Sequence, residues 1–511
     1  MNKKHFNIIG YQIILLWFLS LTFLGSCDYK KPSFSNRPNI VFLLADDLGY
    51  GELGSYGQDI IKTPELDRLA KNGMRFTNFY AGNGVCSPSR SVLLTGKGAT
   101  HTPIRGNAGF FGDDKWYGAW LDKNTFTLGE MMKEAGYNTA FIGKWHLDNP
   151  DDVETWAFGH GFEFAVQEQW KARFESKREF PPNRLWVNGN KEYVPYNFKD
   201  YDCKDALRTE MSFKFLDNRD KEKPFFLFMS YRAPHSFEGP IRDTLFYSNE
   251  TWPDIEKAHA AKITLLDKQV GRLIDKLEQI GELDNTLILF TSYNGPHGAT
   301  GGHDYEFFNS NGGFRGYKRD LYEGGIRVPL IAYWKNIIKN QTTSSHISVF
   351  QDIMPTLAEV AGISIPKETN GISFLPTLIG QEQKKHEFLN WEIQLSGRFQ
   401  NLPDGGFRQA CRIGNWKGVR YGIDSAVELY NLDTDISETN DVASQHPELV
   451  NKILSIFQTN RTETGTFLME GLFRIINRKI NFKKQEARNE KKHLQVYIII
   501  IIYLFYGGLF H

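Results

Sequence analysis

Polar side chains with catalytic chemistry follow four separate apolar runs of this sequence. They are Asp46-Asp47 after 39–44, Lys144 and His146 after 139–142, His235 after 225–229, and Tyr293-Asn294 after 287–290. Short, continuous apolar runs are typical of strands that are buried on both faces of a sheet. In open parallel sheets, ligand sites gather beyond the carboxyl ends of the strands. We therefore expect these side chains to converge on one active site.

Two adjacent carboxylates, Asp46 and Asp47, stand directly after the first apolar run. Calcium and other hard cations prefer oxygen ligands, so this pair is a candidate metal site. An exposed turn is the alternative, because aspartate is also common in turns. The two residues alone do not decide between these interpretations.

Cys86 stands in the run Cys86-Ser87-Pro88-Ser89-Arg90, and Thr95-Gly96 follows a few residues later. A nearby cation lowers the pKa of a thiol and so activates it, which makes Cys86 beside Arg90 a candidate nucleophile. Taken alone, the cysteine can equally be a small buried side chain.

Strand-like and helix-like segments alternate between about 38 and 380, which predicts a mostly parallel α/β sheet covered by helices on both faces. A fifth strand is expected at 328–333, and long helical patterns lie at 255–280 and 350–361. Thr127 and Glu130 have the spacing of a capping box at the start of a helix. From about 385 the segments become shorter and end in a helix near 447–458, which predicts a smaller sheet-and-helix unit.

The 511 residues include 60 Lys and Arg and 60 Asp and Glu, so the formal net charge is zero. Nucleic-acid-binding proteins usually carry a basic excess, and we therefore expect no nucleic-acid partner. Four cysteines in this length exclude a disulfide scaffold. Cys203 and Cys411 form either one disulfide or two buried thiols.

The first 27 residues have the pattern of a secretory signal: two lysines, an apolar run and small residues before Cys27. The sequence Leu24-Gly25-Ser26-Cys27 resembles the bacterial lipoprotein signal, in which the cysteine is acylated. We expect an exported lipoprotein on the periplasmic or cell-surface side, anchored to the membrane through lipidated Cys27, with 28–37 as a tether. An ordinary signal peptide and an uncleaved anchor are the alternatives.

The other end of the chain, 466–511, is a basic stretch followed by an apolar one. The apolar part, 496–510, is shorter than the ~20 residues that a membrane-spanning helix needs. We interpret 466–511 as an extension outside the fold. It is either membrane-associated or the product of a shifted reading frame.

The whole run from Cys86 to Gly96 resembles the signature of the type I sulfatases, in which the cysteine is oxidised to formylglycine. Further segments resemble this family in the expected order over roughly 38–465: 136–146, 234–235, 318–329, 352–357 and 429–440. The chain is thus similar to formylglycine-dependent sulfatases. The segment 309–316 is similar to members described as arylsulfatase A or N-acetylgalactosamine-6-sulfatase.

The resemblance implies an alkaline-phosphatase-like fold, with a catalytic domain over 38–380 and a C-terminal subdomain over 381–465. It also implies one calcium ion, held by Asp46, Asp47, Asn294 and the modified Cys86. The calcium ion and cationic side chains would polarise the sulfate ester and neutralise its charge.

The catalytic roles of the remaining residues follow from the same resemblance. A hydroxyl of the hydrated aldehyde would attack sulfur and give a covalent sulfated intermediate. Arg90 would orient the hydrate, and His146 would help to expel sulfate from the intermediate. Lys144 and Lys318 would grip the sulfate oxygens, while His235, with Lys318, would protonate the departing sugar oxygen. Arg105, His303 and Asp304 are further candidates for contact with the substrate.

One position departs from the family pattern, which reads Ser-Asp-Asn-Gly where this chain reads Ser292-Tyr293-Asn294-Gly295. Tyr293 therefore replaces an aspartate that binds calcium, and a phenol with a reference pKa near ~10 is neutral at pH 7. Either a neighbour such as Asp304 compensates, or calcium binding is weak, or the site is inactive. We expect Tyr293 to impair catalysis strongly.

The function expected from the resemblance is hydrolysis of sulfate esters, with a sulfated carbohydrate as substrate and a formylglycine-generating maturation enzyme as partner. A non-catalytic protein that binds sulfated glycans is the first alternative, and Tyr293 favours it. A phosphatase or phosphodiesterase on the same fold is the second. Those relatives use Ser or Thr as the nucleophile, so Cys86 in its full motif argues against them.

Overall fold

The fold is known from a computed structural model of the chain, which describes most residues from Arg37 to Phe467. The described residues are 37–110, 116–167, 184–188, 193–195, 201–236, 245–298, 302–467 and 469. The predicted signal with Cys27, the tether before Arg37 and the tail beyond residue 469 lie outside them. Within the described residues, none of the helices combines the length and the apolar character that crossing a membrane requires.

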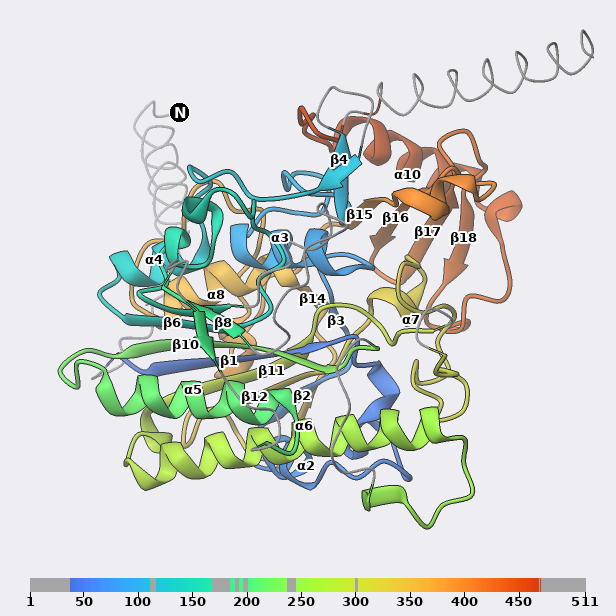
Figure 1. The fold of residues 1–511 in the computed structure, drawn as a ribbon. Helices are drawn as coiled ribbons and strands as arrows, with labels where there is room; N and C mark the ends of the chain where they lie inside the picture. Colours follow the sequence, from blue (N-terminus) through green and yellow to red (C-terminus); the bar gives the residue numbers. More distant parts are fainter. Residues whose placement is uncertain are drawn as a thin grey trace, which may run out of the picture. The chain divides into compact units, whose positions relative to one another are not determined.

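Four parallel strands form the centre of a ten-stranded sheet (Figure 1). Their order is β11 (Thr286–Ser292), β1 (Asn39–Asp46), β10 (Phe225–Pro234) and β6 (Asn138–Gly143). Ile40 of β1 lies opposite Phe226 on one side and Leu287 on the other. All four predicted strands are confirmed, and their carboxyl ends meet at one edge because they run in the same direction.

The outer strands are shorter and are partly antiparallel. Next to β11 come β12 (Leu330–Tyr333), β2 (Met74–Phe76) and β13 (Thr342–Ser344); next to β6 come β7 (Phe164–Gln167), β8 (Arg184–Val187) and β9 (Tyr193–Pro195). The fifth predicted strand, 328–333, forms as β12 but runs antiparallel to β11.

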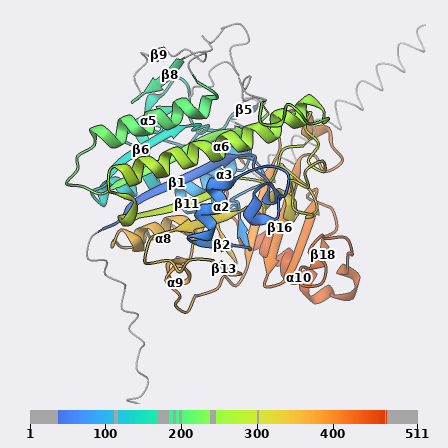
Figure 2. The ribbon, with the colours of Figure 1, turned by 90° about the horizontal axis from the view of Figure 1, so that it is seen from below.

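Helices cover both faces of the sheet (Figures 1 and 2). One face carries α2 (Pro64–Lys71), α5 (Lys204–Asn218) and α6 (Asp254–Gln279); the other carries α3 (Cys86–Thr95), α4 (Leu128–Glu134) and α8 (Ile353–Val360). The predicted capping box begins α4, where the backbone N–H of Thr127 donates to Glu130 Oε2 at 2.7 Å. The buried apolar side chains between the sheet and α2, α5 and α6 form one continuous core cluster.

The second, smaller sheet is antiparallel and lies in the last part of the fold. Its strands are β15 (Leu389–Gln394), β16 (Phe407–Ile413), β17 (Trp416–Tyr421) and β18 (Glu428–Asn431), in that order. Helix α10 (Pro447–Thr459) packs on this sheet through Ile453 and Phe457. The predicted sheet-and-helix unit is therefore present.

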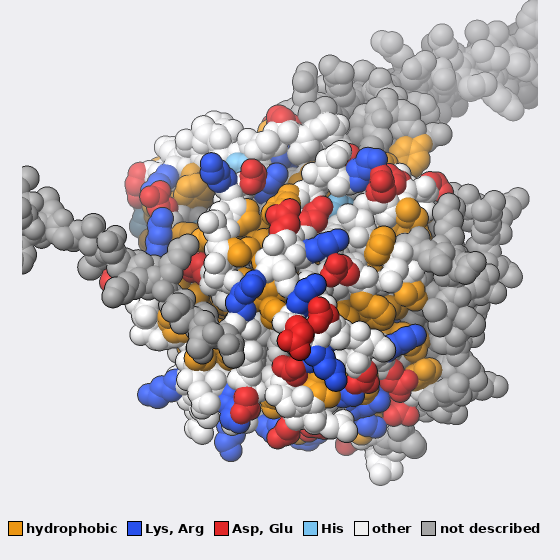
Figure 3. All heavy atoms as spheres, turned by 90° about the vertical axis from the view of Figure 1, so that its left-hand side faces the viewer, with side chains coloured by type: hydrophobic (Ala, Val, Ile, Leu, Met, Phe, Trp, Pro, Cys, Tyr) orange, Lys and Arg blue, Asp and Glu red, His pale blue; other side chains and the backbone are white. Residues whose placement is uncertain are grey.

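Several short elements complete the fold. They are β3 (Phe79–Tyr80) paired with β14 (Ser348–Val349), β4 (Ala108–Phe110) paired with β5 (Trp116–Gly118), and the helices α7 (Glu323–Ile326) and α9 (Leu375–Leu378). Basic and acidic side chains are interspersed on the face that Figure 3 shows.

Two expectations about the later part of the chain are settled by its packing. Cys411 is a buried, free thiol on β16, so it forms no disulfide with Cys203, and burial raises its pKa to about 12.

Phe467 is buried, and its carbonyl accepts a hydrogen bond from Arg461. The predicted extension, 466–511, thus begins with residues that belong to the fold.

Candidate active site

The carboxyl edge of the four central strands gathers most of the predicted catalytic side chains. Asp46 ends β1, Lys144 follows β6, His235 follows β10, and Tyr293 and Asn294 follow β11. Cys86 begins helix α3 and points to the same place, as its contacts below show. The convergence follows directly from the parallel arrangement of strands far apart in the sequence.

The ammonium group of Lys144 connects three of these residues. It donates to Asp46 Oδ2 at 2.8 Å and to the Tyr293 hydroxyl at 3.1 Å, and it lies 3.6 Å from Cys86 Sγ. All four residues are at most 2% exposed. A buried charge needs a partner of opposite sign, and the Lys144–Asp46 pair satisfies both.

Asp47 forms the second half of the cluster. Its backbone has φ +69°, a conformation that aspartate adopts more readily than most residues. Asp47 Oδ2 lies 2.7 Å from Lys318 Nζ and 3.7 Å from His235 Nε2, and Asn294 Nδ2 donates to Oδ1 at 2.9 Å. Burial alone would raise the pKa of Asp47, but Lys318 and His235 outweigh it and lower the pKa to about 2.

Cys86 and Arg90 project from the first turns of α3 into this cluster. Arg90 Nη1 donates to the carbonyl of Lys144 at 2.7 Å and to Ser230 Oγ at 2.8 Å. Its Nε and Nη2 atoms are buried and have no hydrogen-bond partner among the described residues. Arg90 is therefore positioned by part of its guanidinium group and keeps donors for a further acceptor.

Tyr293 fills the space between these cations and the cysteine. Its hydroxyl donates to Cys86 Sγ at 3.3 Å, and the Arg90 guanidinium lies 4.5 Å from its ring centroid. The carbonyl of Tyr293 accepts from Ser89 Oγ at 2.6 Å, which ties β11 to α3. The phenol is thus directed at Cys86 and Lys144, and it contributes no negative charge.

The donor set of the cluster fits a hard cation. Asp46 Oδ1 and Asn294 Oδ1 are buried oxygen atoms with no hydrogen-bond partner among the described residues. Unpartnered buried oxygens are costly, and carboxylate and amide oxygens are the ligands that calcium prefers. Asp46, Asp47 and Asn294 are therefore the residues that could hold a calcium ion, with two negative charges between them.

The two histidines of the predicted site differ in their surroundings. His235 is buried, and its pKa is lowered by burial and by Lys144, so the imidazole is neutral at pH 7. His146 is half-buried, has φ +59°, and its Nδ1 lies 3.3 Å from Ser87 Oγ. Ser87 follows Cys86 directly, which places His146 beside the nucleophile.

Comparison with known proteins agrees with this geometry. Residues 38–363 match the family model described as Sulfatase, and residues 312–462 match the model described as N-sulphoglucosamine sulphohydrolase, C-terminal. The chain belongs to the sulfatase family. The resemblance found in the sequence is confirmed.

Individual relatives are similar over most of this sulfatase. It is 29% identical over 518 residues to an N-acetylgalactosamine-6-O-sulfatase of Bacteroides thetaiotaomicron, with 86% of this chain and 97% of that protein covered. It is 30% identical to the human N-acetylgalactosamine-6-sulfatase, with 78% and 77% covered. An arylsulfatase of Hemicentrotus pulcherrimus is 32% identical, with 68% of this chain and 62% of that protein covered.

The fold is also shared with solved structures. The crystal structure of Ps i-CgsB matches this sulfatase with a TM-score of 0.68 and 25% identity, covering 83% of this chain and 92% of that one. The predicted alkaline-phosphatase-like α/β class is therefore confirmed.

Arg105 corrects one prediction for the sulfatase. Its side chain is fully buried, and Nη1 lies 3.3 Å from Glu392 Oε1 on β15. Its Nη2 donates to the backbone carbonyls of Thr100, at 2.7 Å, and of Thr462. The guanidinium group is paired with Glu392 and joins the segment after α3 to β15, so its contacts are those of a structural residue.

His303 and Asp304 have partners outside the Asp46–Asp47 pair, and their contact with substrate stays a prediction. His303 is buried, and its Nδ1 lies 2.5 Å from Glu256 Oε2 on α6. Asp304 is exposed, and its carboxylate accepts from the backbone N–H of Glu306 at 3.0 Å. No contact between Asp304 and the Asp46–Asp47 pair exists among the described residues, so compensation for the missing aspartate by Asp304 is not supported.

The sequence analysis missed a histidine cluster, which we define as Glu52, Glu256, His259, His297 and His303. His259 Nε2 lies 2.6 Å from Glu52 Oε1, and the rings of His259 and His303 are stacked with centroids 3.5 Å apart. His297 lies edge-on to both rings, at 5.3 Å from each centroid. The only sequence signals were the three-residue spacing of Glu256 and His259 on a helix and the histidines within 297–303.

The histidine cluster has metal-binding residue types but a geometry that opposes a shared ion. Ligand atoms of Glu52, His259 and His303 lie within 4.8 Å of one another. The two rings are nearly parallel, with an interplanar angle of 10°. A metal ion lies close to the plane of each imidazole that binds it, and two parallel planes cannot both contain it. We therefore assign the cluster to the architecture of the sulfatase.

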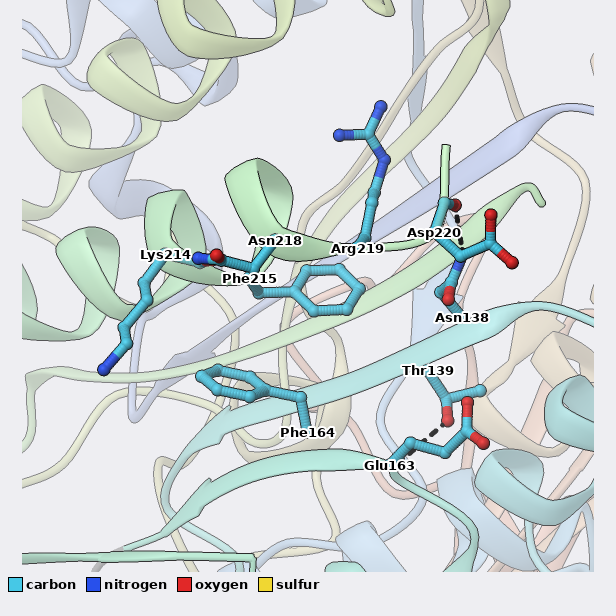
Figure 4. Close-up of a pocket in the computed structure, with 9 residues that line it drawn as sticks. All are labelled: Asn138, Thr139, Glu163, Phe164, Lys214, Phe215, Asn218, Arg219 and Asp220. Carbon is cyan, nitrogen blue, oxygen red and sulfur yellow. Dashed lines mark hydrogen bonds between the residues drawn. The ribbon is translucent and has the colours of Figure 1, made fainter. Parts of the chain in front are cut away.

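The cavity shown in Figure 4 lies at the opposite edge of the main sheet. It has a volume of about 310 Å³ and lies among Asn138, Phe164 and Phe215, where β6 and β7 begin. The rings of Phe164 and Phe215 are stacked with centroids 5.8 Å apart. No predicted catalytic residue lines it, so it is separate from the active site of the sulfatase.

Proposed function

We propose that this sulfatase hydrolyses sulfate esters of carbohydrates through a formylglycine made from Cys86 and a calcium ion. The observation that carries the proposal is the position of Cys86, which lies in its full sulfatase signature and contacts Lys144 and Tyr293 beside the Asp46–Asp47 pair. The aldehyde hydrate supplies the hydroxyl that attacks sulfur, and calcium supplies positive charge at the sulfate oxygens.

The substrate class is a sulfated sugar, and a 6-sulfated galactose-type sugar is the specific proposal. Two relatives support it: the N-acetylgalactosamine-6-O-sulfatase of Bacteroides thetaiotaomicron and the human N-acetylgalactosamine-6-sulfatase. The segment 309–316, which resembles such enzymes, contacts the loop after Asp46–Asp47, where the carbonyl of Ser310 accepts from the backbone N–H of Gly51 at 2.9 Å.

The chain's own cations bind and orient the sulfate group. Lys144, Lys318 and Arg90 bring three positive charges to a cluster with two carboxylates. Such preorganised charges stabilise the negative charge that builds up in the transition state, typically by several kcal/mol. The unpartnered Nε and Nη2 atoms of Arg90 are donors for an oxygen at position 86.

His235 is the residue that we assign to protonate the leaving oxygen once substrate is bound. Its imidazole is neutral in the cluster itself, because burial and Lys144 lower its pKa. A bound sulfate ester adds negative charge beside the ring and raises its pKa toward the working range of a general acid. Lys318 is less suited to this role, since burial lowers its pKa but Asp47 outweighs burial and raises it.

A second candidate function rests on Tyr293 alone. With a neutral phenol where an aspartate would bind calcium, the pocket could keep its cations and lose its turnover, and so act as a binding protein for sulfated glycans. The contacts of the phenol with Cys86 and Lys144 are the observation that favours this alternative.

We also propose that the protein is exported as a lipoprotein and anchored to the membrane through Cys27. The support is the sequence pattern of the first 27 residues. A formylglycine-generating enzyme is the maturation partner that the proposed chemistry requires.

The test is sulfate release by the full chain, produced together with a formylglycine-generating enzyme. N-acetylgalactosamine 6-sulfate is the substrate, calcium is present, and the mass of the Cys86 peptide reports conversion of the thiol. Release by the native chain, absent in Cys86→Ala, supports the proposal. Converted protein that releases nothing while Tyr293→Asp does supports the binding function, and converted protein of both kinds that stays silent overturns the proposed substrate.

A further inference from the structure

We define the active cluster by the residues gathered at the carboxyl edge of the central strands: Asp46, Asp47, Cys86, Arg90, Lys144, His146, His235, Tyr293, Asn294 and Lys318. Two arginines beside it share one aromatic ring. The guanidinium carbon of Arg319 lies 4.5 Å from the ring centroid of Phe399, and that of Arg398 lies 5.1 Å from the same centroid. Arg319 comes from the catalytic domain, and Arg398 and Phe399 lie on a short helical turn, Gly397–Asn401, before β16. We call Arg319 and Arg398 the arginine pair, and both contact the ring of Phe399.

Arg319 is fixed next to the nucleophile by its backbone. It follows Lys318, whose ammonium group binds Asp47 at 2.7 Å. Its N–H donates at 2.6 Å to the carbonyl of Gly84, two residues before Cys86. The close approach needs a glycine there, since a Cβ on Gly84 would lie 2.5 Å from the carbonyl oxygen of Asp320.

The backbone of Arg319 is strained. Its φ is +85°, which is rare for a residue with a long side chain. Asp47 and His146 of the active cluster also have positive φ, at +69° and +59°. Backbone strain of this kind gathers at functional sites, where the surrounding structure holds it in place.

The arginine pair has no acidic partner among the described residues, unlike its neighbour Arg408. Arg408 binds Asp320 at 2.8 Å and Asp404 at 2.7 Å, so it takes up the nearby carboxylates. It also donates to the carbonyl of Arg319 at 3.0 Å. Like charges that contact one ring repel each other, and a bound anion would offset this repulsion. Guanidinium groups match sulfate and carboxylate oxygens with two parallel hydrogen bonds.

We propose that Arg319 and Arg398, held by Phe399, form a second anion-binding site that takes a further sulfate or carboxylate of the glycan substrate. Arg319 lies at the inner end of this site, next to Lys318, and exposed Arg398 lies at its outer end. The preferred substrate then carries a second negative group near the ester that is cleaved. This inference rests on the proposed function, because it concerns the substrate of the same site.

The test measures binding, so that it does not depend on turnover. The full chain with Cys86→Ala is titrated with N-acetylgalactosamine 6-sulfate, with N-acetylgalactosamine 4,6-disulfate, and with a disaccharide of a uronate and N-acetylgalactosamine 6-sulfate. The parent protein prefers at least one of the two doubly anionic ligands. The ligand that it prefers shows whether a sulfate of the same sugar or a carboxylate of the next sugar occupies the site.

Arg398→Ala reduces this preference about 10-fold, as expected for the loss of a charge-assisted hydrogen bond. Arg398→Lys, which keeps the charge but loses the planar fork, retains part of it. Arg68→Ala removes an exposed arginine on α2 that is paired with Glu65, and it leaves all three affinities at the parent values.

Two results overturn the inference: a parent protein without preference for either doubly anionic ligand, and an Arg398→Ala protein in which the preference is unchanged. Sulfate release by the mature native chain decides the proposed function separately. Release of sulfate from the 6-sulfate without any preference among the ligands means that the proposed function holds and the second anion site does not. A preference for a doubly anionic ligand without release of sulfate means that the second anion site holds and the proposed function does not.

Discussion

The active cluster and the histidine cluster are neighbours, but their charged groups are paired differently. Both begin in the segment after β1, with Asp47 in one and Glu52 in the other, and both continue after β11, with Asn294 and His297. In the active cluster, Asp46 and Asn294 have oxygen atoms, and Arg90 has donors, that find no hydrogen-bond partner within the described part of the chain. In the histidine cluster, Glu52 and Glu256 each hold one imidazole at 2.6 and 2.5 Å.

The difference separates residues that act on a ligand from residues that hold the site in place. Buried polar atoms without partners are unfavourable. In the active cluster, a bound cation and an anionic substrate would provide those partners. In the histidine cluster both carboxylates are paired with imidazoles, and only His259 Nδ1 and His297 Nδ1 lack a hydrogen-bond partner among the described residues. The cluster connects the segment after β1, helix α6 and the segment after β11. Substitutions in the first cluster should therefore change activity, and substitutions in the second should change stability.

The largest expected effect is on activity, from Cys86→Ala in the active cluster. Loss of the nucleophile lowers kcat by at least about 10⁴-fold, since the other groups act only on a substrate that this residue attacks. The measurement is sulfate release, with urea unfolding as the control for folding. Activity that survives the substitution would mean that Cys86 is not the reacting residue.

The corresponding substitution in the histidine cluster is His259→Ala. It removes the imidazole that is hydrogen-bonded to buried Glu52. Burial lowers the pKa of His259, so the imidazole is neutral and the loss is that of a buried hydrogen bond, about 1–3 kcal/mol in the free energy of unfolding. The matched control is His446→Ala, where the histidine is partly exposed and lies 3.6 Å from Glu448. That pair contributes less than about 1 kcal/mol. Equal losses in the two variants would contradict the structural role of the cluster.

A substitution at Tyr293 tests whether the active cluster lacks a negative charge. Tyr293→Asp adds a carboxylate to the oxygen donors and should tighten calcium binding by at least about 10-fold, measured by calorimetric titration. Turnover should rise with it. Tyr293→Phe removes the hydroxyl without adding charge, and it should leave calcium binding near the parent value. Native turnover equal to that of Tyr293→Asp would refute the idea that this tyrosine impairs catalysis.

A further expected effect concerns the pH dependence of stability. Burial and His259 lower the pKa of His297 to about 3, below the ordinary value of 6.5. Between these values the folded state binds fewer protons than the unfolded state, so stability is lost as the pH falls below about 6.5. At pH 5 this amounts to something on the order of 2 kcal/mol.

His297→Gln removes this titration and keeps a donor for the carbonyl of Pro234, to which His297 Nε2 lies at 3.2 Å. Urea unfolding at pH 7.5 and at pH 5 should therefore show a smaller loss in the variant than in the native chain. The same loss in both would show that His297 does not bind a proton on unfolding in this range.

The central strands and the residues at their ends could be predicted because each signal is local. An apolar run such as 39–44 has few alternatives to a buried strand, and parallel strands bring Asp46, Lys144 and His235 to one edge. The antiparallel direction of β12 could not be predicted, since direction depends on how the chain returns to the sheet rather than on the residues of the strand.

The errors at the site concern side chains whose partners are distant in the sequence. Arg105 is neutralised by Glu392, which is 287 residues away, and nothing near Arg105 indicates this. Glu52 and His259 are separated by 207 residues, so their pairing was also invisible. A charged residue near a motif is as easily a structural ion pair as a substrate contact, and only the fold separates the two.

If Cys86 is oxidised as proposed, its burial determines when the protein becomes an enzyme. At 2% exposure, with Lys144 and Tyr293 packed against its sulfur, the thiol of a finished molecule is out of reach of another protein's catalytic groups. On the proposed chemistry, oxidation must come before this end of the sheet closes. The activity of each chain is therefore decided between synthesis and folding. A chain that folds before Cys86 is oxidised stays inactive.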